Sequence, residues 1–182
     1  MSTADAQDDS EALPRGVRLG VDVGDVRVGL ARSDLDGMIA TPVETIERQV
    51  ATRRVADEAL EAEARVIMVG LPRSLNGTEG PAAAKAREFT SDLAAMLSQE
   101  EQDVEIRLLD ERLTTVTAHQ ALHTSGRKGR KHRQVVDQVA AVMILQQALD
   151  IERSTRARAG ELVDPSQPAA RVTDGTEQED GG

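Results

Sequence analysis

The amino-terminal part of the chain contains a strongly apolar run with a carboxylate inside it. Residues 17–23 read Val-Arg-Leu-Gly-Val-Asp-Val and are followed directly by Gly24. Valine and leucine pack well on a pleated surface, so the run predicts a buried strand. An ionised carboxylate among valines is costly unless it is paired, hydrogen-bonded or bound to a cation. Asp22 therefore either caps the turn at Gly24 or belongs to a site that other residues complete.

The segments that follow this strand predict an α/β fold with a mixed sheet. Residues 26–33 alternate in period two after a two-residue turn, which predicts a hairpin. Residues 38–46 predict a third strand, which Pro42 favours at a sheet edge. Later apolar runs and amphipathic segments predict strands at 65–70 and 104–109 and helices around 51–62, 81–97, 114–126 and 133–153. A meander followed by β-α-β units predicts five strands, antiparallel at first and parallel afterwards, with helices on both faces.

The length and the distribution of charge predict one domain between two acidic tails. The net charge is -10, of which residues 1–14 contribute -4 and residues 160–182 contribute -5. Both ends are rich in Gly, Pro, Gln, Ser and Asp and have too little apolar surface to offset the entropy of ordering. We therefore expect disordered tails at 1–14 and 154–182 and a domain at 15–153 that is close to neutral.

Composition also narrows the classes of function. No apolar run approaches the roughly 18 residues of a membrane span, and the acidic N-terminus lacks the layout of a secretory signal. The chain has no cysteine, which excludes disulfides and thiolate metal sites and favours the cytoplasm. The one aromatic residue, Phe89, has helical spacing and is expected in the core. Recognition of a nucleic acid would therefore use backbone and shape rather than base stacking.

Two further carboxylates follow the strand predicted at 104–109. Asp110 and Glu111 stand where that strand ends, and ligands of α/β sheets collect beyond the carboxyl ends of strands. Adjacent residues of a strand point to opposite faces, so we expect only one of the two to face a shared site. The alternative is an ordinary acidic strand end.

The last predicted helix also carries an acid on its apolar side. The residues three, four, seven and eight positions after Asp137 are all apolar: Ala140, Ala141, Ile144 and Leu145. Asp137 therefore faces the sheet in the first turn, where the helix dipole tolerates negative charge. A capping residue would precede the apolar run rather than lie within it. The small alanines let the helix approach the sheet closely.

Carboxylates from the first strand, a later parallel strand and the last helix can meet at one sheet edge. Crowded acids repel one another unless divalent cations bind them, and hard oxygen ligands without cysteine or a histidine cluster favour Mg²⁺ or Mn²⁺. Two such ions about 3.5–4 Å apart can activate a water and stabilise the leaving oxygen in phosphodiester hydrolysis.

A basic run precedes the Asp137 helix: Arg127, Lys128, Arg130, Lys131, His132 and Arg133, interrupted by Gly129. In a body that is close to neutral, this run predicts a phosphate-binding surface. A solvated loop is the alternative. His119 and His123 have a zinc-like spacing, but without a third ligand they are better interpreted as surface histidines.

Four motifs, in this order, resemble the YqgF/RuvX family, whose fold is ribonuclease H-like. They are Asp22-Val23-Gly24 with Arg27, Gly29 and Ser33-Asp34; Gly70-Leu71-Pro72 with Asn76-Gly77-Thr78; residues 110–115, Asp-Glu-Arg-Leu-Thr-Thr; and Asp137-Gln138-Val139-Ala140-Ala141. The resemblance covers about residues 16–153. It implies that Asp22, Glu111 and Asp137 are the metal-binding carboxylates, which selects Glu111 over Asp110. The motif arginines Arg27 and Arg112 join the basic run as expected contacts to nucleic acid.

The family is linked to maturation of the 5′ end of pre-16S rRNA and to resolution of Holliday junctions. One departure from its pattern concerns the first turn, where Asp25-Val26 stands in place of the Thr-Lys-like pair of many members. A substrate contact at these positions is therefore not expected here, and Asp25 would repel phosphate.

Three functional classes compete at this point. The first is a Mg²⁺- or Mn²⁺-dependent nuclease acting on structured nucleic acid, with an RNA precursor before a four-way DNA junction. The second is a sugar-kinase or actin-type ATPase, but the chain lacks a second lobe and a Gly-x-x-x-x-Gly-Lys-Ser/Thr loop. The third is a non-catalytic nucleic-acid-binding module of ribosome assembly. The carboxylates favour the nuclease.

Overall fold

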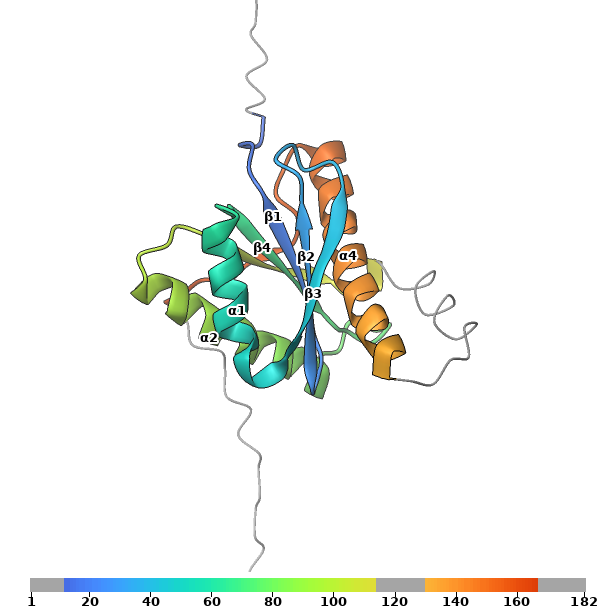
Figure 1. The fold of residues 1–182 in the computed structure, drawn as a ribbon. Coiled ribbons are helices and arrows are strands. Elements are labelled where there is room, and N and C mark those ends of the chain that lie inside the picture. The colour runs from blue at the N-terminus through green and yellow to red at the C-terminus, as the bar shows by residue number, and fades with distance from the viewer. Residues whose placement is uncertain (1–11, 114–129, 167–182) are drawn as a thin grey trace, which may run out of the picture.

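A mixed sheet with helices on both faces forms the centre of the protein (Figure 1). The computed structural model describes residues 12–113 and 130–166. Its strands are β1 (Arg18–Val23), β2 (Arg27–Ser33), β3 (Ala40–Glu47), β4 (Val66–Leu71), β5 (Glu105–Asp110) and β6 (Glu161–Leu162). Its helices are α1 (Arg48–Glu61), α2 (Pro81–Gln99), the short 3-10 helix η1 (Glu111–Leu113) and α4 (Arg130–Thr155).

The sheet has the strand order β3-β2-β1-β4-β5-β6. The pairs β1–β2 and β2–β3 are antiparallel, whereas β1–β4 and β4–β5 are parallel. The predicted meander followed by parallel strands is therefore confirmed. Strand β3, which contains Pro42, lies at the sheet edge as predicted, and its pairing with β2 shifts register where Ala31 faces Pro42.

Each face of the sheet has its own apolar core. Helices α1 and α2 cover one face and α4 covers the other, on opposite sides of the sheet in Figure 1. Phe89 of α2 is completely buried in the first core, as its helical spacing predicted. The second core is built mainly from α4, where Ala141, Leu145, Ala148 and Leu149 are inaccessible to solvent. No helix in the described ranges is long and apolar enough to span a membrane.

The structure differs from the sequence prediction in the number of strands and in several element boundaries. Five strands were expected, but residues 161–162 form a sixth, antiparallel to β5, in which Arg107 pairs with Leu162. The first part of the predicted tail at 154–182 thus belongs to the sheet, because a two-residue edge strand has too short a pattern to be recognised. Helix α4 begins at Arg130 rather than residue 133. The predicted helix at 114–126, with His119 and His123, and the remainder of both tails at 1–11 and 167–182 lie outside the described residues.

Candidate active site

The three predicted carboxylates come from elements that converge at the carboxyl end of β1. Asp22 is the fifth residue of β1, Glu111 follows β5 directly, and Asp137 lies near the start of α4. Because β1, β4 and β5 are parallel neighbours, their carboxyl ends lie at the same end of the sheet. Helix α4 begins at that end and runs back along the sheet, so its first turns lie near the ends of these strands (Figure 1).

The pleat of β1 directs alternate residues toward α4. Arg18 forms a buried ion pair with Glu152 of α4, with 3.2 Å between the Arg18 Nε and the Glu152 Oε2. A Cβ placed on Gly20 would lie 2.6 Å from the Cβ of Leu145 in the same helix. Asp22 is the next residue on this face, since side chains of a strand alternate with period two. Its position therefore follows from the same alternation that buries Leu19 and Val21 on the other face.

Two glycines allow helix and carboxylates to approach the sheet at this point. Gly29 pairs with Asp22 in the β1–β2 ladder, and a Cβ at Gly29 would lie 2.1 Å from the carbonyl oxygen of Asp137. A Cβ at Gly70 of β4 would lie 2.3 Å from Oε1 of Glu111. Neither position can carry a larger residue without a shift of α4 or of the Glu111 side chain.

The strand glycines, and not only the alanines of α4 expected from the sequence, make this close approach possible. Both glycines interrupt apolar strand patterns, which is the recognised signal for another group approaching the backbone closely. That signal is visible in the printed sequence at positions 29 and 70.

Burial and mutual repulsion raise the pKa values of the carboxylates. The pKa of Asp22 rises from 3.8 to about 6, chiefly because the group is buried and secondly because Asp137 is near. The pKa of Glu111 rises from 4.5 to about 7 through burial, the charge of Asp22 and the charge of Asp110. Burial also raises the pKa of Asp137, against the attraction of Arg27. Asp22 is thus electrostatically coupled to both of the other acids.

Asp110 belongs to a different environment from its neighbour Glu111. Its carboxylate accepts hydrogen bonds from the Arg112 backbone N–H at 3.0 Å and from the Arg112 Nη2 at 2.6 Å. The Arg73 Nη1 lies 3.6 Å from the same carboxylate. These contacts, the Arg112 side chain first among them, lower the pKa of Asp110. The two adjacent acids thus have different partners, although the charge of Asp110 also contributes to the raised pKa of Glu111.

The predicted contacts to nucleic acid have different surroundings. Arg27 is the first residue of β2, and its positive charge opposes part of the rise in the pKa of Asp137. The guanidinium of Arg112 is held by Asp110. Arg127 and Lys128 lie outside the described residues. Arg130, Lys131 and Arg133 are in the first turns of α4, and their side chains are likewise outside the described part.

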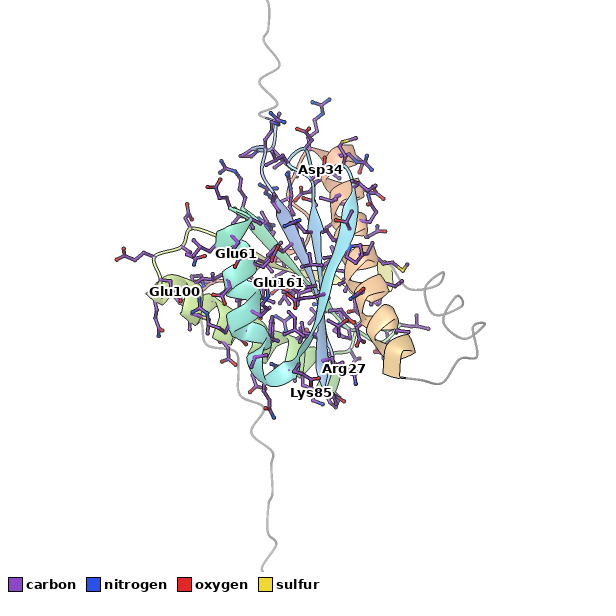
Figure 2. The ribbon with its side chains drawn as sticks, in the orientation of Figure 1. Arg27, Asp34, Glu61, Lys85, Glu100 and Glu161 are labelled. Atoms are coloured by element: carbon purple, nitrogen blue, oxygen red, sulfur yellow. The ribbon has the colours of Figure 1, made fainter. Side chains whose placement is uncertain are left out.

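One charged contact at this edge was not foreseen. Lys85 of α2 forms an ion pair with Asp25, which lies in the turn between β1 and β2. Figure 2 shows Arg27 and Lys85 at the end of the molecule opposite Asp34. From the sequence alone, Asp25 is expected only to repel phosphate. Nothing in the order of residues indicates that its partner Lys85 lies 60 positions away.

The carboxylates suit a divalent cation by their chemistry, because they are buried hard oxygen donors whose negative charges raise one another's pKa. In the described part of the chain, however, no three histidine, cysteine or acidic side chains are close enough together to form one metal site. The coupling instead joins the acids in two pairs that share Asp22.

Comparison with known proteins agrees with the fold and the motifs. Residues 16–151 match the family model described as RuvX, Holliday junction resolvase. A relative from Nocardioides sp. is 52% identical over 155 residues, which cover 82% of this chain and 97% of the relative. A relative from Streptomyces coelicolor is 52% identical over 161 residues, covering 87% of this chain and 94% of the relative. Both carry the name "Putative pre-16S rRNA nuclease".

Among solved structures, that of T. thermophilus RuvC in complex with a Holliday junction substrate is similar in fold. The TM-score is 0.51 at 14% sequence identity, and the match covers 79% of this chain and 99% of that one. At this identity the likeness concerns the fold, which is ribonuclease H-like as expected. Because the family model spans most of the chain and close relatives align over nearly their whole length, the chain belongs to the RuvX family.

Proposed function

We propose that this protein is a metal-dependent nuclease that hydrolyses phosphodiester bonds in structured nucleic acid. Processing of the 5′ end of pre-16S rRNA in the cytoplasm is its proposed task. The observation that carries the proposal is the coupling of Asp22 to both Glu111 and Asp137 in a buried setting. Keeping three partly buried acids near one another destabilises a protein, so their presence favours a role in binding cations.

Asp22, Glu111 and Asp137 are the proposed metal ligands and catalytic residues. The proposed cofactor is Mg²⁺ or Mn²⁺, as two ions, for which Asp22, Glu111 and Asp137 would supply carboxylate oxygens. When bound, such ions activate a water and stabilise the leaving oxygen. The chain's own contribution is to hold the oxygens in place: β1 fixes Asp22, and the space left by Gly70 admits the carboxylate of Glu111.

Basic residues around this edge are the proposed contacts to the phosphate backbone. Arg27 lies next to Asp137 and carries a positive charge toward the acids. Arg112 is held at the end of β5 by Asp110, which orders its guanidinium before a substrate arrives. The residues Arg127, Lys128, Arg130, Lys131 and Arg133 extend this set, as the sequence predicts. Such contacts bind nucleic acid without reading its sequence.

The choice of substrate is supported by the relatives. Relatives that are about half identical in sequence carry a name that refers to pre-16S rRNA, which favours an RNA precursor. Cleavage of four-way DNA junctions is the second candidate, favoured by the description of the family model and by the fold shared with a junction-binding resolvase.

The test is a side-by-side digestion of an rRNA precursor and a four-way DNA junction in Mg²⁺ or Mn²⁺. We compare the wild type with Glu111→Gln, and use Glu61→Gln as the matched control because Glu61 is exposed at the end of α1, on the opposite face of the sheet. The proposal expects cleavage by the wild type and by the control, and loss of cleavage with retained binding for Glu111→Gln.

Other outcomes separate the competing classes. Binding without cleavage by the wild type in either metal would favour a non-catalytic module of ribosome assembly. Tight binding of ATP in the absence of nucleic acid would favour an ATPase. Equal cleavage by the wild type and Glu111→Gln would remove Glu111 from the reaction.

A further inference from the structure

We propose that Lys85 is a phosphate-binding residue at the edge of the active site and that Asp25 weakens its contact with substrate. The inference rests on the proposed function, since it concerns how the same site receives a nucleic-acid backbone. It names a residue that the basic motifs of the sequence do not include, and it gives Asp25 a role beyond simple repulsion.

The turn that carries Asp25 has a fixed position relative to Asp22. Asp25 follows Asp22 by three residues, and the turn is closed by a hydrogen bond from the Gly24 N–H to the Arg27 carbonyl oxygen at 2.9 Å. A second bond of 2.9 Å, from the Arg48 N–H to the Val26 carbonyl oxygen, attaches the turn to the start of α1. A side chain that reaches this turn from α2 therefore lies at the carboxyl end of β1, on the sheet face opposite α4.

Lys85 reaches the turn from α2 and pairs with the Asp25 carboxylate. Both side chains remain accessible, with exposed fractions of 48% for Lys85 and 73% for Asp25. An exposed pair of this kind contributes only about 0–1 kcal/mol to stability. The pair is therefore not needed to hold the fold together, and the carboxylate of Asp25 competes with phosphate for the ammonium of Lys85.

The negative charge of the nearby acids explains why the pairing of Lys85 with Asp25 matters for phosphate binding. Asp22, Glu111 and Asp137 already place negative charge where the substrate must approach. Asp25 adds a further carboxylate at the rim, and its pairing with Lys85 neutralises a cation that would otherwise attract phosphate. The pair thus lowers the affinity for nucleic acid and reduces the dependence of binding on salt.

Salt dependence measures the effect directly. For B-form DNA, each neutralised phosphate adds about 0.9 to the negative slope of log affinity against log salt. We measure binding of a labelled four-way DNA junction and of a labelled RNA stem-loop in EDTA, which prevents cleavage, between about 50 and 200 mM salt. With the DNA probe, Asp25→Asn is expected to make the slope steeper by about 0.9. The affinity of Asp25→Asn relative to that of the wild type should therefore fall about 3.5-fold from the lowest to the highest salt concentration.

A double-mutant cycle shows whether this gain passes through Lys85. In the Asp25→Asn background, Lys85→Gln is expected to return the slope to the wild-type value, whereas Lys85→Arg retains the steeper slope. The matched control is Asp57→Asn, which makes the same change of net charge in an exposed pair with Arg53 on α1 and is expected to leave the slope unchanged.

The outcomes separate this inference from the proposed function. Binding of both probes by the wild type, with the same slope for Asp25→Asn or with a gain that persists after Lys85→Gln, overturns the inference alone. If the wild type binds neither probe, the proposed function and the inference are both overturned. A steeper slope that depends on a cation at position 85 supports both.

Discussion

Replacing Asp22 with asparagine removes a buried negative charge from β1 while preserving the shape of the side chain. Burial and the neighbouring Asp137 raise the pKa of Asp22 from 3.8 to about 6. The folded protein therefore binds a proton at Asp22 more tightly than the unfolded chain does. For a group of this kind, the stability present below pH 4 is lost as the pH rises through about 6.

The size of the effect follows from the difference between the two pKa values. At 1.36 kcal/mol per pKa unit, a rise from 3.8 to about 6 corresponds to about 3 kcal/mol at pH 8. At pH 4 Asp22 is almost fully protonated in the folded protein and about 40% protonated in the unfolded chain, so the same linkage gives only about 0.5 kcal/mol. Asp22→Asn is therefore expected to be more stable than the wild type by about 3 kcal/mol at pH 8 and nearly equal at pH 4.

Urea unfolding of both proteins at the two pH values, without divalent cations, provides the measurement. The exposed acid Asp92 of α2 offers a control, since Asp92→Asn is expected to change the free energy of unfolding by less than about 0.5 kcal/mol. Addition of Mg²⁺ or Mn²⁺ is expected to stabilise the wild type and not Asp22→Asn. A difference at pH 8 below about 1 kcal/mol, or one independent of pH, would refute the argument that Asp22 is a buried, repelled carboxylate.

Two other substitutions test how the site is held. Gly70→Ala is expected to move the Glu111 carboxylate by about 1 Å, because a Cβ there lies 2.3 Å from Oε1, and so to slow cleavage about 100-fold. The control Gly80→Ala, where a Cβ meets nothing within 4 Å, should cleave at the wild-type rate. Equal rates for the two variants would contradict the steric argument. Arg18→Ala removes one of the two arginines that pair with the buried Glu152, the other being Arg158, and is expected to lower the free energy of unfolding by about 2 kcal/mol in urea. A loss below about 1 kcal/mol would show that the pair is not a stabilising contact.

Local patterns were sufficient for most of the architecture. The apolar run at 17–23, the alternation at 26–33 and Pro42 gave the meander and its edge strand, because side-chain period and backbone chemistry act within a few residues. The structure corrected the count of strands. Strand β6 has only two residues and forms because the edge of β5 is available, which is a property of the assembled sheet.

The candidate site likewise combines features that the sequence predicts with features that only the folded chain shows. The sequence alone identifies Asp22, which lies inside an apolar run, and Asp137, which lies on the apolar side of the last helix. The choice between Asp110 and Glu111 came from the family resemblance. Their different surroundings, one held by Arg112 and the other near Asp22, arise in the folded chain.

The sequence by itself thus determined the elements, the family and the acids that merit attention. Only the tertiary structure decided which groups approach one another: the carboxylate of Glu111 over Gly70, the start of α4 over Gly29, and Lys85 beside Asp25. The physical reason is that hydrophobic periodicity acts over a few residues, whereas charge repulsion and steric fit depend on distances between segments far apart in the chain.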